Sequence, residues 1–202
     1  MPPFETALSG LILWAVLGYL LGSIPFGIVI ARALGLGDLR KIGSGNIGAT
    51  NVLRTGNKPA ALATLVLDSF KGAIAVLIAR QFAGEDAAQL AGLCAFLGHC
   101  FPVWLGFKGG KGVATFLGLL LGLAFPLGLA ACATWAAGAL LTRISSASAL
   151  LAAALAPVWA WALGYPSVVV LCGVLAVIVW GRHHANIVRI LKGEEPKIGK
   201  KG

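Results

Sequence analysis

Residues 113–142 read VATFLGLLLGLAFPLGLAACATWAAGALLT, a stretch without a single charged residue. A helix needs about 20 apolar residues to cross the hydrocarbon core of a membrane, so this stretch is too long for one span and short for two. Pro126 lies near its middle, where a tight turn fits. We therefore expect two short transmembrane helices that meet near Pro126.

The rest of the chain continues this pattern of apolar runs separated by polar segments. Of its 202 residues, 58% are hydrophobic and 11% are charged, against roughly 25% charged in a soluble domain. A backbone in lipid must satisfy its own hydrogen bonds, and the absence of period-2 alternation favours helices over a barrel. The prediction is an all-α polytopic membrane protein of about seven short spans, organised as a single domain over residues 1–202. The other five predicted spans are Leu8–Ile30, Pro59–Ile78, Ala87–Leu105, Ala147–Leu163 and Ser167–Gly181.

The charges indicate the orientation of these spans. Seven spans place the segments 32–58, 108–111, 143 and 182–201 on one side, and these hold 14 of the 16 Lys and Arg residues. Basic loops stay in the cytoplasm, so we expect the N-terminus outside and the C-terminus in the cytoplasm. Topology also accounts for the net charge of +9, and we expect no nucleic-acid partner.

The first basic segment contains GSGNIGATNVLR at residues 43–54. Glycines let backbone N–H groups approach an anion, and Ser, Thr and Asn add neutral donors. Arg54 adds a planar cationic fork that suits phosphate. The alternative is a flexible, solvated loop. We favour a phosphate-binding segment, because these residue types are so dense beside the membrane.

The second segment reads FKGGKGVAT at residues 107–115. Its Gly-Gly-Lys-Gly run precedes a predicted helix, and a helix N-terminus with a lysine is typical of an anion site. Lys108 and Lys111 are also explained as topology signals. His99, just before this segment, is interpreted as a structural histidine near a helix end.

Two further segments complete the polar side: TRISSASA at residues 142–149 and RHHANIVRILKGEEPKIG at residues 182–199. The serines of the first cap the following helix or bind a ligand. In the second, His183 and Asn186 are three residues apart and share a helix face. A basic tail on lipid headgroups is the alternative. Within the second span, Asp68 and Lys71 are expected to pair or to face a polar interior, because isolated charges there are costly, and we favour a structural pair.

Together these segments resemble the bacterial acyl-phosphate:glycerol-3-phosphate acyltransferase family (PlsY), over essentially the whole chain. The resemblance implies transfer of a fatty acyl group from acyl phosphate to the 1-hydroxyl of glycerol 3-phosphate, giving lysophosphatidic acid and inorganic phosphate. It also implies a bacterial cytoplasmic (inner) membrane location, with the active site facing the cytoplasm. The implied catalytic residues are Ser44, Lys111, His183 and Asn186. The implied substrate-binding residues are Gly45, Asn46, Thr50, Asn51, Arg54, Lys108, Gly110, Arg143 and Ser146.

The donor is already activated, because phosphate is a good leaving group. We expect direct transfer without an acyl-enzyme and without a metal or cofactor, with a substrate phosphate assisting proton removal and His183 orienting phosphate or acting as a weak base. The main alternative is a small transporter of organic phosphates, for which the intramembrane Asp68 and Lys71 are suited. A scaffold for anionic lipid explains the charge but not the Gly, Asn and Thr residues.

Overall fold

The computed structural model describes residues 1–199, and this part of the chain is helical with no strand. The α-helices are α1 Leu8–Gly22, α2 Phe26–Ala33, α3 Ala49–Leu53, α4 Lys58–Ala83, α5 Glu85–Cys100, α6 Val113–Leu123, α7 Phe125–Thr142, α8 Ser145–Ala162, α9 Val169–Arg182 and α10 His184–Leu191. Short 3₁₀ helices occur at Leu39–Lys41, Val103–Leu105 and Pro166–Val168.

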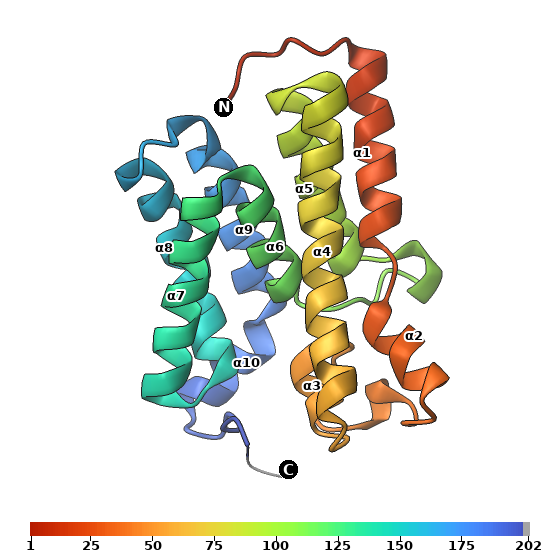
Figure 1. The fold of residues 1–202 in the computed structure, drawn as a ribbon. Coiled ribbons are helices and arrows are strands. Elements are labelled where there is room, and N and C mark those ends of the chain that lie inside the picture. The colour runs from red at the N-terminus through yellow and green to blue at the C-terminus, as the bar shows by residue number, and fades with distance from the viewer. Residues whose placement is uncertain (200–202) are drawn as a thin grey trace.

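The long helices form one bundle with α6 in the middle (Figure 1). On one side α5 packs against α1 and α4, and on the other α8 packs against α7 and α9, while α6 contacts both α4 and α7. The N-terminus lies at the upper end of the bundle, and the chain leaves it at the lower end, together with α2, α3 and α10 (Figure 1). Three of the four polar segments therefore lie at this end, and the second, between α5 and α6, lies higher along the bundle (Figure 1).

Among residues 1–199, five segments are long and apolar enough to cross a membrane: Leu8–Ala33, Lys58–Ala83, Glu85–Leu105, Phe125–Thr142 and Ser145–Ala162. A sixth candidate combines Pro166–Arg182 with His184–Leu191, which are bent by 65°. The remaining predicted span corresponds to α6, whose 11 residues extend about 16 Å. It is too short to cross a core about 30 Å thick by itself. The expected division near Pro126 is confirmed, because α6 ends at Leu123 and α7 starts at Phe125 with Pro126 in its first turn.

The first predicted span, Leu8–Ile30, is not one straight helix. It is broken between α1 and α2 at residues 23–25. Pro25 has no N–H to donate and disfavours helical backbone at Ile24, which explains the break. The upper part is tied closely to α5: a Cβ added to Gly18 or Gly22 would overlap the backbone of Ala91 or Ala95. Small residues four apart let two helices approach in lipid.

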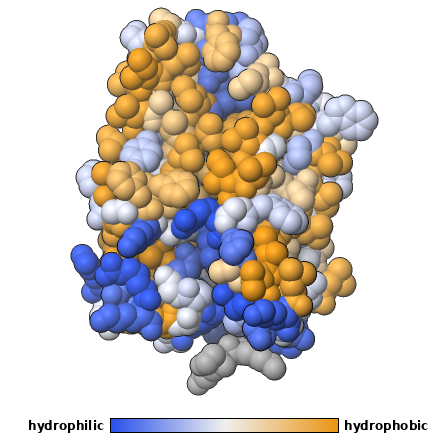
Figure 2. Space-filling model, turned by 180° about the vertical axis from the view of Figure 1, so that it is seen from behind, coloured by the Kyte–Doolittle hydropathy of each residue, from blue (hydrophilic) through white to orange (hydrophobic). Residues whose placement is uncertain are grey.

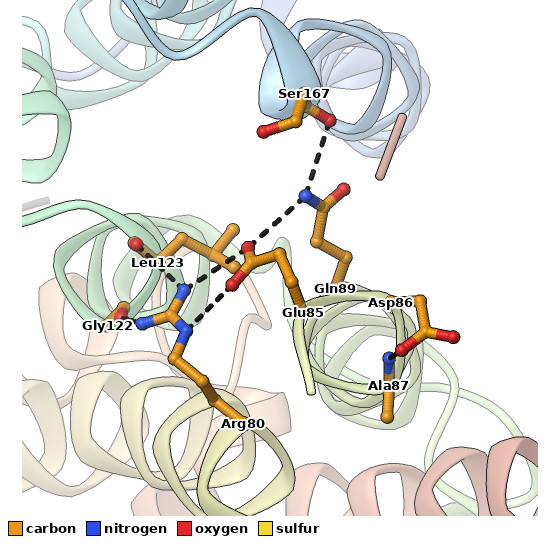
Figure 3. A network of polar contacts seen from close by, with 8 residues as sticks. All are labelled: Arg80, Glu85, Asp86, Ala87, Gln89, Gly122, Leu123 and Ser167. Atoms are coloured by element: carbon orange, nitrogen blue, oxygen red, sulfur yellow. Dashed lines mark hydrogen bonds and ion pairs between the residues drawn. The ribbon is translucent and has the colours of Figure 1, made fainter. Parts of the chain in front are cut away.

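Arg80 provides hydrogen-bond donors for the last carbonyls of the short α6 (Figure 3). Its guanidinium donates to the carbonyls of Gly122 and Leu123, at 2.7 and 2.8 Å, and pairs with Glu85 at 2.8 Å. The last carbonyls of a helix have no partner within it, so these bonds satisfy groups that would otherwise be unpaired. Arg80 is one of the two basic residues outside the four basic segments, and these contacts give it a structural role.

The surface divides into an apolar part and a polar end. From behind, hydrophobic residues cover most of the height and hydrophilic residues gather toward the lower end (Figure 2). Lys200 and Lys201, which the orientation argument counted among the basic residues, lie outside the described residues.

Candidate active site

Asn51 organises the first polar segment from inside. Its side chain is buried, with the amide nitrogen donating to the Leu39 carbonyl at 2.8 Å. Its carbonyl oxygen accepts from the Ser44 N–H at 3.2 Å and from Arg54 Nη1 at 3.4 Å. Gly43 has a φ of +51°, and a Cβ there would lie 2.6 Å from Arg54 Nη1. The segment thus folds around Asn51, and the Arg54 side chain packs directly on Gly43.

The glycines of the second segment fold back on the end of α5. The N–H of Gly110 donates to the His99 carbonyl at 3.0 Å, and that of Gly109 to the Cys100 carbonyl at 3.2 Å. Arg182 reaches across from α9 and donates to both glycine carbonyls, at 3.1 and 3.0 Å. These two amides are already paired, so the charge that the segment presents to an anion comes from Lys111.

Lys111 lies at a junction with the other two polar segments. Its ammonium donates to Asn186 Oδ1 at 2.5 Å. Glu195 stands on the other side of Asn186 and accepts from Asn186 Nδ2 at 2.5 Å, from Ser146 Oγ at 2.7 Å and from Arg189 Nε at 2.6 Å. Asn186 and Ser146 are buried. One carboxylate of the C-terminal segment therefore holds groups from α8 and α10 beside the lysine.

The charges around Lys111 favour an anionic ligand. The pKa of Lys111 is lowered to about 8, mainly by burial; Glu195 opposes this shift, and Arg189, Arg54 and Arg182 add to it. Three arginines thus act on this lysine, and one of them, Arg54, belongs to the first segment. The excess of positive charge in a partly buried site is suited to a phosphate group.

The carboxyl group of Glu195 remains ionised in this environment. Burial alone would raise the pKa of Glu195, but the hydrogen bonds from Ser146, Asn186 and Arg189 outweigh it and hold the pKa below its usual range. A carboxylate that accepts several hydrogen bonds is stabilised in its charged form. Glu195 is therefore the fixed acceptor of the junction.

His183 is buried at the bend between α9 and α10, with Nδ1 2.7 Å from the Val179 carbonyl. A carbonyl only accepts, so Nδ1 carries the proton and Nε2 of the neutral ring keeps its lone pair. The neighbouring His184 is exposed. Of the two histidines, only His183 is placed beside the junction, as the helix spacing with Asn186 predicts.

Other predicted residues lie nearer the surface. Thr50 and Lys108 are exposed. Asn46 accepts from the Ile47 N–H at 2.9 Å, and Gly45 occupies a left-handed turn with a φ of +68°. Arg143 is exposed, and its carbonyl accepts from the Ile198 N–H at 2.7 Å. This last bond holds the C-terminal segment against the third polar segment.

Sequence reasoning did not assign a role to Glu195, Arg182 or Arg189. Glu195 had a recognisable signal, because Glu194 and Glu195 are the only acidic residues in the basic segment 182–201. No comparable signal marks Arg182, whose task depends on the glycine carbonyls of a distant segment. Among residues 1–199, no group of three or more His, Cys, Asp or Glu side chains is placed to hold a metal ion.

Comparison with known proteins identifies the family. A family model described as glycerol-3-phosphate acyltransferase matches residues 12–193. The chain belongs to the glycerol-3-phosphate acyltransferase family. A glycerol-3-phosphate acyltransferase of Cereibacter sphaeroides is 73% identical over 201 residues, with 100% of both chains covered. One from a Jannaschia species is 68% identical over 200 residues, covering 99% of this chain and 98% of its own.

Solved members of the glycerol-3-phosphate acyltransferase family share the fold. The crystal structure of PlsY, an integral membrane glycerol 3-phosphate acyltransferase, in its glycerol 3-phosphate form is similar with a TM-score of 0.89 and 40% identity; the match covers 94% of this chain and 96% of that one. The lysophosphatidic acid form gives 0.87 and 38%, covering 94% and 95%. The predicted all-helical, multi-pass membrane architecture and the predicted family are confirmed.

Proposed function

We propose that this acyltransferase takes its acyl group from acyl phosphate and transfers it to the 1-hydroxyl of sn-glycerol 3-phosphate at the junction around Lys111. The observation that carries the proposal is the convergence of four polar segments there: Lys111 bonds Asn186, Glu195 bonds Ser146, and Arg54 acts electrostatically on Lys111. Both substrates carry phosphate, and a half-buried lysine among arginines is suited to bind it.

The transfer forms an ester bond between the glycerol oxygen and the acyl carbon, and it breaks the bond from the acyl carbon to the phosphate oxygen. The bonding electrons leave with the phosphate. The hydroxyl proton passes to a phosphate oxygen of a substrate, or to His183 Nε2, whose lone pair is free because Nδ1 donates to Val179. In this proposal Lys111 and Arg54 neutralise phosphate charge, and Ser44 donates to the developing oxyanion.

Alignment contributes most of the rate in this proposal. Holding a hydroxyl and an acyl carbonyl in reactive geometry removes a large entropic cost. Asn186 and Ser146 are fixed by Glu195, so their polar groups have fixed positions when substrate arrives. The exposed Thr50, Lys108 and Arg143, together with Gly45 and Asn46, supply outer contacts with the substrates. Gly110, whose N–H and carbonyl are already paired, contributes by positioning Lys111. No metal or cofactor takes part in the proposal.

The polar end of the bundle is assigned to the cytoplasm, in a bacterial cytoplasmic membrane. The assignment rests on the gathering of basic residues at this end, because basic loops are retained in the cytoplasm. A test is to place a cysteine at the exposed Lys192 and label it with a membrane-impermeant maleimide. We expect labelling in inverted vesicles and none in intact spheroplasts, and the reverse pattern would contradict the assignment.

The donor is tested with purified protein in vesicles, radiolabelled glycerol 3-phosphate and three acyl donors: acyl phosphate, acyl-coenzyme A and an acyl carrier protein thioester. We expect lysophosphatidic acid and inorganic phosphate in equal amounts from acyl phosphate alone. Product from a thioester but not from acyl phosphate would overturn the donor assignment. Accumulation of labelled glycerol 3-phosphate inside sealed vesicles, without product, would favour the transporter alternative.

A further inference from the structure

A group of three ionisable side chains lies in the helical bundle, away from the junction. Asp68 and Lys71 on α4 form the expected pair, with 2.9 Å between Lys71 Nζ and Asp68 Oδ1. The side chain of Lys71 is 1% exposed and that of Asp68 is 3% exposed. His99 on α5 joins them, with Nδ1 3.7 Å from Asp68 Oδ1. All three are buried. Burying ionisable groups inside a membrane protein costs free energy, so such a group is expected to have a functional role.

One side of this group reaches the Lys111 segment. The His99 ring lies directly on Gly110, because a Cβ added to that glycine would overlap His99 Nε2. The His99 carbonyl also accepts the Gly110 N–H at 3.0 Å. Lys111 follows Gly110 in the chain, so the His99 ring, which lies beside Asp68, limits where the Lys111 backbone can start.

The other side reaches the segment that carries Arg54. Lys71 Nζ donates to the Ile24 carbonyl at 2.9 Å, at the break between α1 and α2, and lies 5.7 Å from the centre of the Phe26 ring. Next along α2, a Cβ on Gly27 would overlap the Ile47 carbonyl. Lys71 therefore fixes α2, and α2 packs directly on the polar segment 43–54.

We infer that Asp68, Lys71 and His99 are positioning residues that set the distance between the Arg54 segment and the Lys111 segment. The inference rests on the proposed function, because it assumes that both cations act on substrate phosphate. A hydrophobic trio would pack α4 and α5, but it would not give the Ile24 carbonyl a donor or place a carboxylate beside the His99 ring. The hydrogen bond from Lys71, its ion pair with Asp68 and the contact of the His99 ring with Gly110 meet in one buried group and hold both segments in register. Misplacement by about 1 Å is enough to cost on the order of a hundredfold in rate.

The test uses Asp68→Asn and His99→Gln, which keep similar volume, in vesicles with acyl phosphate and glycerol 3-phosphate. We expect kcat/KM for glycerol 3-phosphate to fall about tenfold or more, with the KM for acyl phosphate changed much less. In a Lys111→Met background the same substitutions should cost less than about threefold, because residues that act through one another are not additive. The matched control is Glu85→Gln, which removes a structural ion pair of α5 at the other end of the bundle.

The outcomes separate the two proposals. If the unchanged protein makes no lysophosphatidic acid, the proposed function fails. If the unchanged protein is active and both variants match it, or if both lose activity only in proportion to their unfolding as Glu85→Gln does, the positioning role is overturned. Full additivity with Lys111→Met would also overturn it. If Asp68→Asn does not fold, His99→Gln decides, and failure of both to fold would assign the group to the fold instead.

Discussion

Lys111 Nζ donates a 2.5 Å hydrogen bond to Asn186 Oδ1, although the two residues are 75 positions apart in the chain. The partner of this half-buried ammonium is a neutral amide oxygen, and the nearby carboxylate of Glu195 is bonded to Ser146, Asn186 and Arg189. A phosphate oxygen can therefore replace the amide without breaking an ion pair. The hydrogen bond to Asn186 therefore holds Lys111 in position while leaving its charge available to an anion.

The first prediction concerns the charge of that lysine. Lys111→Met should lower kcat/KM for glycerol 3-phosphate by about tenfold to a hundredfold, because a hydrogen bond to a charged group contributes about 1.5–3 kcal/mol. Lys192→Met is the matched control, since Lys192 is exposed at the same end of the bundle. Steady-state kinetics of both variants measure the difference, and equal losses would contradict the assignment of Lys111.

The second prediction concerns pH. With a pKa of about 8 in the free protein, Lys111 is cationic below that pH and loses its proton as the pH rises through it. kcat/KM reports the free enzyme, so it should fall above about pH 8. In Lys111→Arg the guanidinium stays charged in this range, and the alkaline fall should disappear. A profile of kcat/KM against pH that is identical in both proteins would show that another group titrates.

The third prediction concerns Glu195. Replacing it by Gln places an amide NH₂ among the donors from Asn186, Ser146 and Arg189, so we expect a loss of about 1–3 kcal/mol in stability and a large loss of activity. The control is Glu194→Gln, since Glu194 is exposed. Thermal unfolding in detergent measures both, and equal melting temperatures would contradict the role of Glu195.

The same carboxylate determines how the stability of the protein changes in acid. The pKa of Glu195 is lower in the folded protein than in the unfolded chain, so its contribution to stability is present above the unfolded pKa and is lost as the pH falls through the lowered folded value. The stability difference between the unchanged protein and Glu195→Gln should therefore shrink in acid. A difference that grows in acid would contradict this.

The fourth prediction concerns the backbone under Arg54. In Gly43→Ala the new Cβ meets Arg54 and Asn51 in a left-handed turn, whereas in Gly35→Ala the turn is similar, with a φ of +65°, and nothing lies within 4 Å. Both variants carry roughly 1–2 kcal/mol of backbone strain. Only Gly43→Ala should also raise the KM for glycerol 3-phosphate, because only it displaces Arg54. Equal KM values would show that strain alone acts.

Patterns that depend on neighbours in the chain were predictable. The uncharged stretch with Pro126 gave two helices, and the spacing of Asp68 and Lys71 gave their ion pair. The break before α2 was missed, although Pro25 marks it, because the apolar run continues through it without a charge. Apolarity alone does not distinguish a continuous span from a broken one.

Contacts between distant segments were not predictable from spacing. Arg182 donates to glycine carbonyls 72 and 73 residues away, and His99 meets Asp68 only because α4 and α5 pack side by side. Motif segments identified the residues around Lys111, but not that Glu195 would hold Ser146 and Asn186 together. Such a junction is set by packing of the bundle, which a single sequence does not display.

The most direct test of the junction is a structure of this protein with glycerol 3-phosphate bound. We expect the phosphate to lie within about 3.2 Å of Lys111 Nζ, with Arg54 directed to the same group and Glu195 still bonded to Ser146. Phosphate bound elsewhere, with the hydrogen bond from Lys111 to Asn186 unchanged, would contradict it.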